Sequence, residues 1–352
     1  MTTVQASTDS LLLAASKRPL PRRSSLGVGA GSLVVSALLF VLTPLDGVAD
    51  FLVFWAVAYV VAMTSVSVVV EGSRRARDRL ASTLTTGALI LALIPLVAVL
   101  AFTIARGLGR FDMTFFTHSM LSVADSDAGG GAYHAIVGTI EQVGIATLIS
   151  VPLGLLVSIY LVEYARGRFG RLVSTFVDVM TGLPSIVAGL FVLALWVLIL
   201  KQGYSGFAGS LALVILMVPV VVRTTEEMLR LVPDSLREAS FALGIPRWRT
   251  IQAVILPTAL PGITTGVMLA IARVSGETAP LLLTVFGSSA INFNPFSGPQ
   301  EGLPLFVFNE AGLPNDTALA RAWAGALTLI ALVILLNVVA RLLVRRSKLQ
   351  PS

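Results

Sequence analysis

One stretch of the sequence restricts the fold more than any other feature. Residues 84–105 read LTTGALILALIPLVAVLAFTIA and contain no charged side chain. About 20 apolar residues in an α-helix, each rising about 1.5 Å, span the hydrocarbon core of a bilayer. A continuous helix also satisfies the backbone polar groups, which cannot remain unpaired in lipid. The stretch therefore predicts a transmembrane helix.

Seven further segments have a similar character. With the first, the predicted spans are 26–44, 49–70, 84–105, 138–162, 176–200, 207–222, 261–287 and 321–344. Of the 352 residues, 55% are hydrophobic and 12% are charged, whereas about 25% charged residues is usual in soluble domains. The predicted fold class is an all-α integral membrane protein, a polytopic helical bundle of about eight transmembrane helices.

The basic residues are distributed unevenly between the two sides that eight spans create. If the N-terminus lies inside, nineteen of the 25 basic residues fall in inside segments. The opposite segments contain only Arg106, Arg110, Lys201 and Arg321. This bias follows the positive-inside rule and predicts that both termini are cytoplasmic. It also argues against nucleic-acid binding, which the net charge of +6 alone could suggest.

Residue usage excludes several kinds of chemistry. The chain has no cysteine, which excludes disulfides, thiolate zinc sites and cysteine catalysis. His118 and His134 lie in one predicted polar loop, where solvated side chains are a better interpretation than a metal site. No Walker A pattern occurs, so any ATP hydrolysis must belong to another chain. An intramembrane enzyme ranks last, because no span carries paired carboxylates or a His-x-x-x-His pattern.

The segment 223–260 is cytoplasmic in this topology, amphipathic, and too polar to span. Asp234 or Ser235 can cap free N–H groups at a helix start. The sequence Gly-Ile-Pro at 244–246 ends that helix and allows a second one to begin. Such a helical hairpin can dock in a groove of a soluble partner or rest on lipid headgroups. Physical reasoning alone leaves both interpretations open.

The spacing in this segment resembles the EAA loop of ABC importer permeases. That pattern is Glu-Ala-Ala, three residues, Gly, nine residues and then Ile-x-Leu-Pro. The matching residues here are Glu238, Ala239, Ser240, Gly244, Val254, Leu256 and Pro257. Ser240 replaces an alanine and Val254 an isoleucine. The resemblance implies that the loop docks into a cleft of an ATPase subunit, with Gly244 in the turn and Glu238 facing the ATPase.

Charged residues also lie inside the predicted span 261–287. Arg273 is about 12 residues, or roughly 18 Å, into that span, and Glu277 follows on the same helical face. The two form either a self-neutralising ion pair or an anion site adjusted by Glu277, and the cost of an intramembrane charge favours function. Arg223, at the inner end of span 207–222, is a second cation, for which physics alone favours a membrane anchor. Arginine suits phosphate because its planar fork donates two parallel hydrogen bonds.

Four longer runs are similar to Pst-type phosphate permeases, and the PstA-like subunit is the best match. These runs are 141–167, 183–191, 221–239 and 272–286. The resemblance extends from about 84 to 345 and implies a six-span ABC importer permease that moves phosphate by alternating access. It implies that Arg223, Arg273 and Glu277 lie on the substrate pathway.

The same resemblance implies partners. They are a homologous PstC-like permease, a dimeric PstB-like ATPase that carries ATP and Mg, and an extracytoplasmic PstS-like phosphate-binding protein. The chain itself is expected to be a transporter membrane subunit that binds no cofactor and catalyses no reaction. Loops near 106–137 and 288–320 either meet such an external partner or are simple connectors.

The predicted organisation has four parts. They are a cytoplasmic tail at 1–25, two extra helices with a basic loop at 26–80, the permease domain at 84–345, and a tail at 346–352. The apolar run after the tail is long for a signal peptide, which favours a retained helix. Gly182, Pro184, Gly276 and Pro280 are expected kink points. Sulfate, molybdate or phosphonate is the alternative cargo, and a transporter or channel without ATP is the alternative class.

Overall fold

A computed structural model describes residues 20–21, 24–42, 47–165 and 167–347. The predicted tails at 1–25 and 346–352 lie mostly outside these residues. The described residues are almost entirely helical, with two isolated β-bridges in place of any named strand. The chain divides into two compact units, 1–100 and 101–352.

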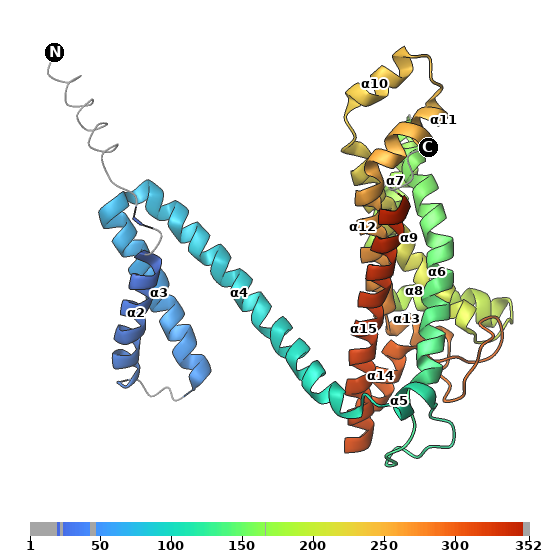
Figure 1. The fold of residues 1–352 in the computed structure, drawn as a ribbon, viewed down its shortest axis with the longest axis horizontal. Coiled ribbons are helices and arrows are strands. Elements are labelled where there is room, and N and C mark those ends of the chain that lie inside the picture. The colour runs from blue at the N-terminus through green and yellow to red at the C-terminus, as the bar shows by residue number, and fades with distance from the viewer. Residues whose placement is uncertain (1–19, 22–23, 43–46, 166, 348–352) are drawn as a thin grey trace. The chain divides into compact units, whose positions relative to one another are not determined.

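The first unit contains two paired helices and most of a third. α2 (Ser24–Phe40) packs against α3 (Val48–Glu71), and Gly72 alone separates α3 from α4 (Ser73–Gly107) (Figure 1). The Phe40 and Phe51 rings meet edge to face, with centroids 5.3 Å apart. Most large apolar side chains of these helices are exposed, which is the expected surface for helices in lipid.

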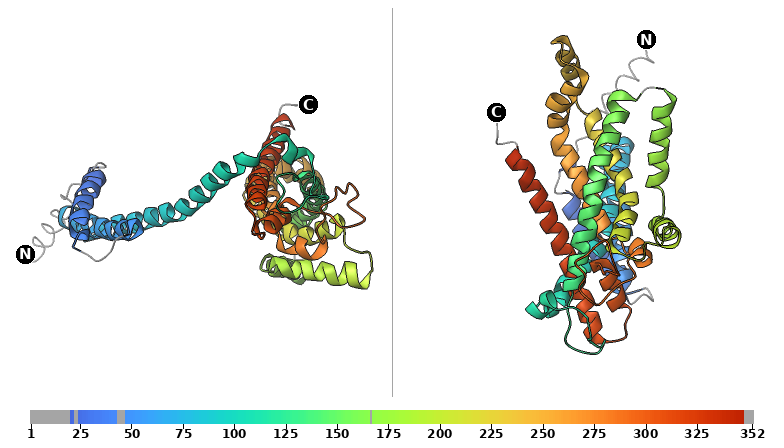
Figure 2. Two further views of the ribbon diagram at one scale, coloured as in Figure 1. Left: turned by 90° about the horizontal axis from the view of Figure 1, so that it is seen from below. Right: turned by 90° about the vertical axis from the view of Figure 1, so that its right-hand side faces the viewer.

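The second unit is a bundle of long and short helices. Its helices are α5 (Met113–Thr117), α6 (Tyr133–Ile159), α7 (Arg168–Thr181), α8 (Ser185–Val192), α9 (Gly206–Arg230), α10 (Asp234–Ala242), α11 (Arg247–Thr250), α12 (Leu256–Ser275), α13 (Ala279–Thr284), α14 (Leu303–Ala311) and α15 (Asp316–Ser347). Segments of π-helix extend α6 and α8 and join α11 to α12. Within this unit, α10 and α11 lie at one end of the bundle, and α5 and α14 lie at the other (Figures 1 and 2).

α9 is the most buried of the long helices and packs against α6, α8, α12 and α13. Small residues permit these close approaches, as they do in other membrane bundles. A Cβ on Gly154 of α6 would lie 2.6 Å from Val221 Cγ1 of α9. A Cβ on Gly189 of α8 would lie 2.7 Å from the Cα of Pro280. The helix contacts at these two positions therefore require glycine.

Six helical segments of the described chain are long and apolar enough to cross a membrane, or seven if one bent pair counts as a span. The predicted count of eight is thus not confirmed. α2 has 17 residues, which is short for a span. The predicted span 261–287 is wrong in its limits, because the helix from Arg247 ends at Ser275.

The chain bends where glycine and proline were expected to kink it. α7 and α8 meet at an angle of 105°, and Gly182 and Pro184 lie in the break between them. A second break separates α12 from α13 and contains Gly276, while Pro280 lies in the first turn of α13. Glycine and proline both weaken helical continuity, which accounts for the positions of the two breaks.

Candidate coupling and transport site

The loop at 231–255 forms a helix, a tight turn and a second helix at one end of the second unit. Gly244 lies in the turn after α10 at φ +74°, a left-handed conformation that glycine adopts without steric cost. The Gly244 amide donates to the Phe241 carbonyl, and the Ile245 amide donates to the Ser240 carbonyl over 3.2 Å. These bonds close the helix in the manner of a Schellman cap.

Ser240, which stands where the EAA pattern has alanine, joins the two arms of the loop. Its hydroxyl lies 2.7 Å from the Thr250 hydroxyl, and both residues are buried. Below them, Val232 and Ile251 pack with Leu229 of α9 and Ile255 in one apolar cluster. The loop is therefore seated on the bundle as a rigid piece.

Arg237 anchors the loop to the end of α6. Its guanidinium lies 3.2 Å from the Glu163 carboxylate and donates to the carbonyls of Leu229 and Val232. The Arg237 and Glu163 side chains are only 14% and 6% exposed. Because a shielded charge that loses its partner stays unsolvated, this ion pair holds the loop in one orientation.

Arg237→Gln should lower the melting temperature of the purified chain by roughly 5–10 °C, since breaking a shielded pair costs about 3 kcal/mol. Arg230→Gln is the matched control, because Arg230 pairs with Glu226 but is 67% exposed. Its effect should stay within about 2 °C, as is usual for surface pairs. Thermal unfolding in detergent measures both. Equal melting temperatures for the Arg237 variant and the wild type would show that the pair does not hold the loop.

The residues predicted to couple with an ATPase lie along this one segment. Glu238 and Ala239 are exposed on α10, and Gly244 is exposed in the turn. Leu256 is half-buried and Pro257 is exposed in the first turn of α12. The five residues thus all belong to the single stretch of chain that runs from α10 through the turn to the first turn of α12.

Arg273 lies in the last turn of α12 rather than in the middle of a span. Glu277 is beyond the helix end, so the expected i, i+4 helical spacing does not exist. Arg273 is exposed and Glu277 is half-buried. Among the described residues the two form no ion pair. The self-neutralising pair is therefore not observed, and the Arg273 guanidinium is accessible at the surface of the single chain.

Arg223 is already paired. Its guanidinium lies 2.6 Å from the Asp178 carboxylate and 2.5 Å from that of Glu226, and it donates to the Ser174 carbonyl. Asp178 and Ser174 belong to α7, so the arginine ties α7 to α9. Its Nε is buried without a hydrogen-bond partner in the described chain. Of the three predicted pathway residues, Arg223 is therefore held in ion pairs, whereas Arg273 and Glu277 form none among the described residues.

Sequence reasoning missed a buried arginine at the opposite end of the bundle. The side chain of Arg321 is 1% exposed and lies 2.7 Å from the Glu310 carboxylate. It also donates to the carbonyls of Asp125 and Asp127 in the loop before α6. Arg321 appeared in the sequence only as a charge at a span edge. Its role in joining α14 and α15 to the loop before α6 depends on contacts nearly two hundred residues apart in the sequence, which no local pattern reveals.

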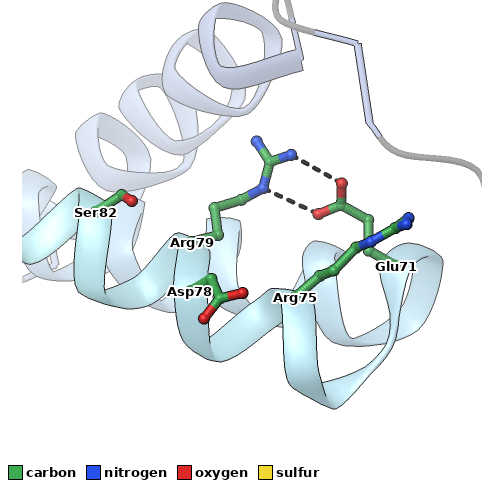
Figure 3. Close-up of a pocket in the computed structure, with 5 residues that line it drawn as sticks. All are labelled: Glu71, Arg75, Asp78, Arg79 and Ser82. Atoms are coloured by element: carbon green, nitrogen blue, oxygen red, sulfur yellow. Dashed lines mark hydrogen bonds and ion pairs between the residues drawn. The ribbon is translucent and has the colours of Figure 1, made fainter.

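The first unit has a pocket of its own, lined by Glu71, Arg75, Asp78, Arg79 and Ser82 (Figure 3). Arg79 donates two hydrogen bonds to the Glu71 carboxylate, at 2.9 and 2.8 Å. The Ser67 hydroxyl and the Leu20 amide donate to the same carboxylate. This arrangement closes the turn between α3 and α4. Because Arg79 is neutralised there, we treat the pocket as structural.

Comparisons with known proteins agree with this architecture. Residues 150–349 match the family described as "Binding-protein-dependent transport system inner membrane component". The chain is similar to "Phosphate transport system permease protein PstA 1" of Mycobacterium tuberculosis (strain CDC 1551 / Oshkosh), with 48% identity over 273 residues, which are 77% of this chain and 89% of the relative. It is 41% identical to PstA of Yersinia pestis over 276 residues, which are 78% of this chain and 92% of the relative.

A solved structure shares the fold. It is the crystal structure of a bacterial alginate ABC transporter in complex with an alginate pentasaccharide-bound periplasmic protein. The TM-score is 0.57 at 13% identity, with 78% of this chain and 97% of the other chain covered. At this identity the likeness concerns the fold alone.

The helical bundle, its projecting loop and these matches define a multi-pass membrane subunit of a binding-protein-dependent transport system. Within that class, the chain belongs to the PstA family of phosphate transport system permease proteins. The predictions of an all-α membrane fold, of a permease rather than an enzyme, and of the family are confirmed. ATP hydrolysis by transporters of this class resides on a separate chain.

Proposed function

We propose that the chain translocates inorganic phosphate into the cell as one permease subunit of an ABC importer. The observation that carries the proposal is 48% identity to a phosphate transport permease over 89% of that relative's length. The exposed guanidinium of Arg273 is consistent with this cargo, because guanidinium groups bind phosphate oxygens in a bidentate way.

The loop around α10 is the proposed coupling element. It presents large exposed side chains that a soluble cleft could cover: Leu236, Phe241, Leu243 and Trp248, of which Leu243 is 79% exposed. An exposed apolar patch outside the bundle is typical of an interaction site. The proposed partner is a dimeric PstB-like ATPase that carries ATP and Mg, and Glu238, Ala239, Gly244, Leu256 and Pro257 are the proposed coupling residues.

The remaining assembly follows from the same proposal. A PstC-like permease would complete the pathway, and a PstS-like protein would deliver phosphate from outside. α15 runs from the α5–α14 end of the bundle to the end that carries α10. This direction supports a C-terminus on the same, cytoplasmic, side as the coupling loop. Arg273, Glu277 and Arg223 are the proposed pathway residues.

The test is uptake of radiolabelled phosphate at low concentration by cells that lack this chain, with and without complementation. We expect uptake to depend on the chain, to require the ATPase, and to be unaffected by excess sulfate or phosphonate. If cells that lack the chain lose sulfate uptake but keep phosphate uptake, the transported anion is sulfate and not phosphate. Uptake that persists without the ATPase would favour a transporter or channel of another class.

A further inference from the structure

A small pocket of about 110 Å³ lies between the two loops at the α5–α14 end of the second unit. Its exposed lining residues are Asp125 and Ser289, one from each loop, and Asn309 of α14. Its floor is buried and includes His134 and Glu301. In the proposed topology this end faces away from the ATPase, so the pocket opens toward the outside of the cell.

Glu301 differs from the other shielded glutamates. Four of them each pair with an arginine: Glu71, Glu163, Glu226 and Glu310. Glu301 is 6% exposed and forms no ion pair with any described residue. Within the described part of the chain its hydrogen-bond donors are the Ser288 amide, at 3.0 Å, and the Asn309 side chain, at 3.4 Å. A buried carboxylate without a cation is costly unless it is protonated or receives a positive charge from outside.

A second observation points to a ligand at the same place. His134 is 3% exposed, lines the pocket, and has an Nδ1 atom without a hydrogen-bond partner among the described residues. An imidazole nitrogen that carries no proton is an acceptor. Glu301 and His134 thus offer acceptors to a donor that the described chain does not supply. No group of three or more possible ligands in the described chain could hold a metal ion, so an organic cation fits better.

We propose that this pocket receives a lysine ammonium group of the extracytoplasmic binding protein that delivers substrate. The inference rests on the proposed function, because it needs such a protein to dock on this face. An ammonium group has three donors and no acceptor, which matches a site that offers carboxylate oxygens and an imidazole nitrogen. Seating the lysine between both loops would also fix the docking register.

The proposed contact predicts a pH dependence. Burial raises the pKa of Glu301 to about 7, and the nearby Glu310 charge acts in the same direction. The other titratable or charged groups around it are Asp125, His134 and, behind Glu310, Arg321. Ammonium binds the ionised carboxylate, whereas a proton competes with it at low pH. Docking should therefore tighten as the pH rises through about 7.

The experiment uses the complete transporter in nanodiscs and its phosphate-loaded binding protein as the probe. Glu301→Gln should weaken docking about tenfold or more, since it removes one partner of a shielded charge pair, and should abolish the pH dependence. Asp316→Asn is the matched control, because Asp316 is exposed on the same face outside the pocket. It should change docking less than about twofold.

Two further measurements keep the test independent of folding in the variant. With wild-type transporter, lysine acetylation of the binding protein should weaken docking, because it removes the positive charge and two of the three N–H donors. A carbodiimide should form an amide between Glu301 and one lysine. The proposal is overturned if Glu301→Gln docks as tightly as the wild type and the carbodiimide forms no cross-link to Glu301 in the wild type. The proposal is also overturned if Na⁺ or Mg²⁺ raises the melting temperature of the wild type but not of Glu301→Gln, while docking is the same for both. That result would mean that the pocket binds an inorganic cation. Phosphate uptake at saturating binding protein reports separately on the proposed function.

Discussion

Gly244→Val should lower ATP-driven phosphate uptake about tenfold or more while leaving the chain in the membrane. Gly244 has φ +74°, where a β-branched residue is a steric outlier. A Cβ at this position would meet no atom within 4 Å, so the cost arises from the backbone and not from a clash. That cost is about 1–2 kcal/mol, which lowers the equilibrium constant for forming the native turn by roughly tenfold.

The expected loss of transport follows from the position of the turn. Gly244 sets the angle between α10, which carries Glu238, and α11. A rigid hairpin docks only when both arms fit the partner's groove. We therefore expect uptake and copurification of the ATPase to fall together, by about tenfold or more. Membrane levels of the chain should remain normal, because Gly244 is exposed and lies outside the buried bundle.

Gly203→Val is the matched control. Gly203 has φ +78° and also has no atom within 4 Å of an added Cβ, so the backbone strain is comparable. It lies just before α9, at a distance in sequence from the coupling loop. Uptake should be retained in this variant. Normal ATPase copurification with Gly244→Val would contradict the docking role of the loop.

Much of this fold could be predicted from hydropathy because apolar stretches in lipid must be helical. The limits of two spans could not. A hydropathy window averages across Gly276, so the seventh span was extended beyond Ser275. The break near Pro184 was indicated by the residue itself, but its angle of 105° depends on the packing of α8 against α9 and α13.

The parts of the site that lie within one segment of the sequence could be predicted, whereas contacts between residues far apart in the sequence could not. The spacing from Glu238 to Pro257 lies within one segment and could be read directly. Arg237 pairs locally with the exposed Asp234, but its shielded partner Glu163 is 74 residues away in the sequence, so no local pattern reveals that pair. Likewise, Glu301 looked like a loop residue, because its burial depends on α14 and on the preceding loop folding over it.

Arg273→Gln should reduce phosphate uptake at least about tenfold, because it removes an accessible cation that can bind phosphate in a charge-assisted way. Arg273 is exposed and unpaired among the described residues. A positive charge in a last helical turn also favours the helix dipole, by typically about 0.3–1 kcal/mol. If this small effect on the helix were the sole role of Arg273, its replacement by glutamine would leave phosphate uptake nearly unchanged. The two roles therefore differ clearly in their expected effect.

Arg106→Gln separates these roles experimentally. Arg106 is likewise exposed and in the last turn of its helix, α4, so its removal has the same dipole cost without touching the proposed pathway. Initial rates of radiolabelled phosphate uptake measure both variants, with ATPase copurification as the check on assembly. Arg273→Lys should retain part of the uptake, because it keeps the charge but loses the bidentate fork. Equal uptake for Arg273→Gln and Arg106→Gln would remove Arg273 from the pathway and leave phosphate selection to residues that a partner permease supplies.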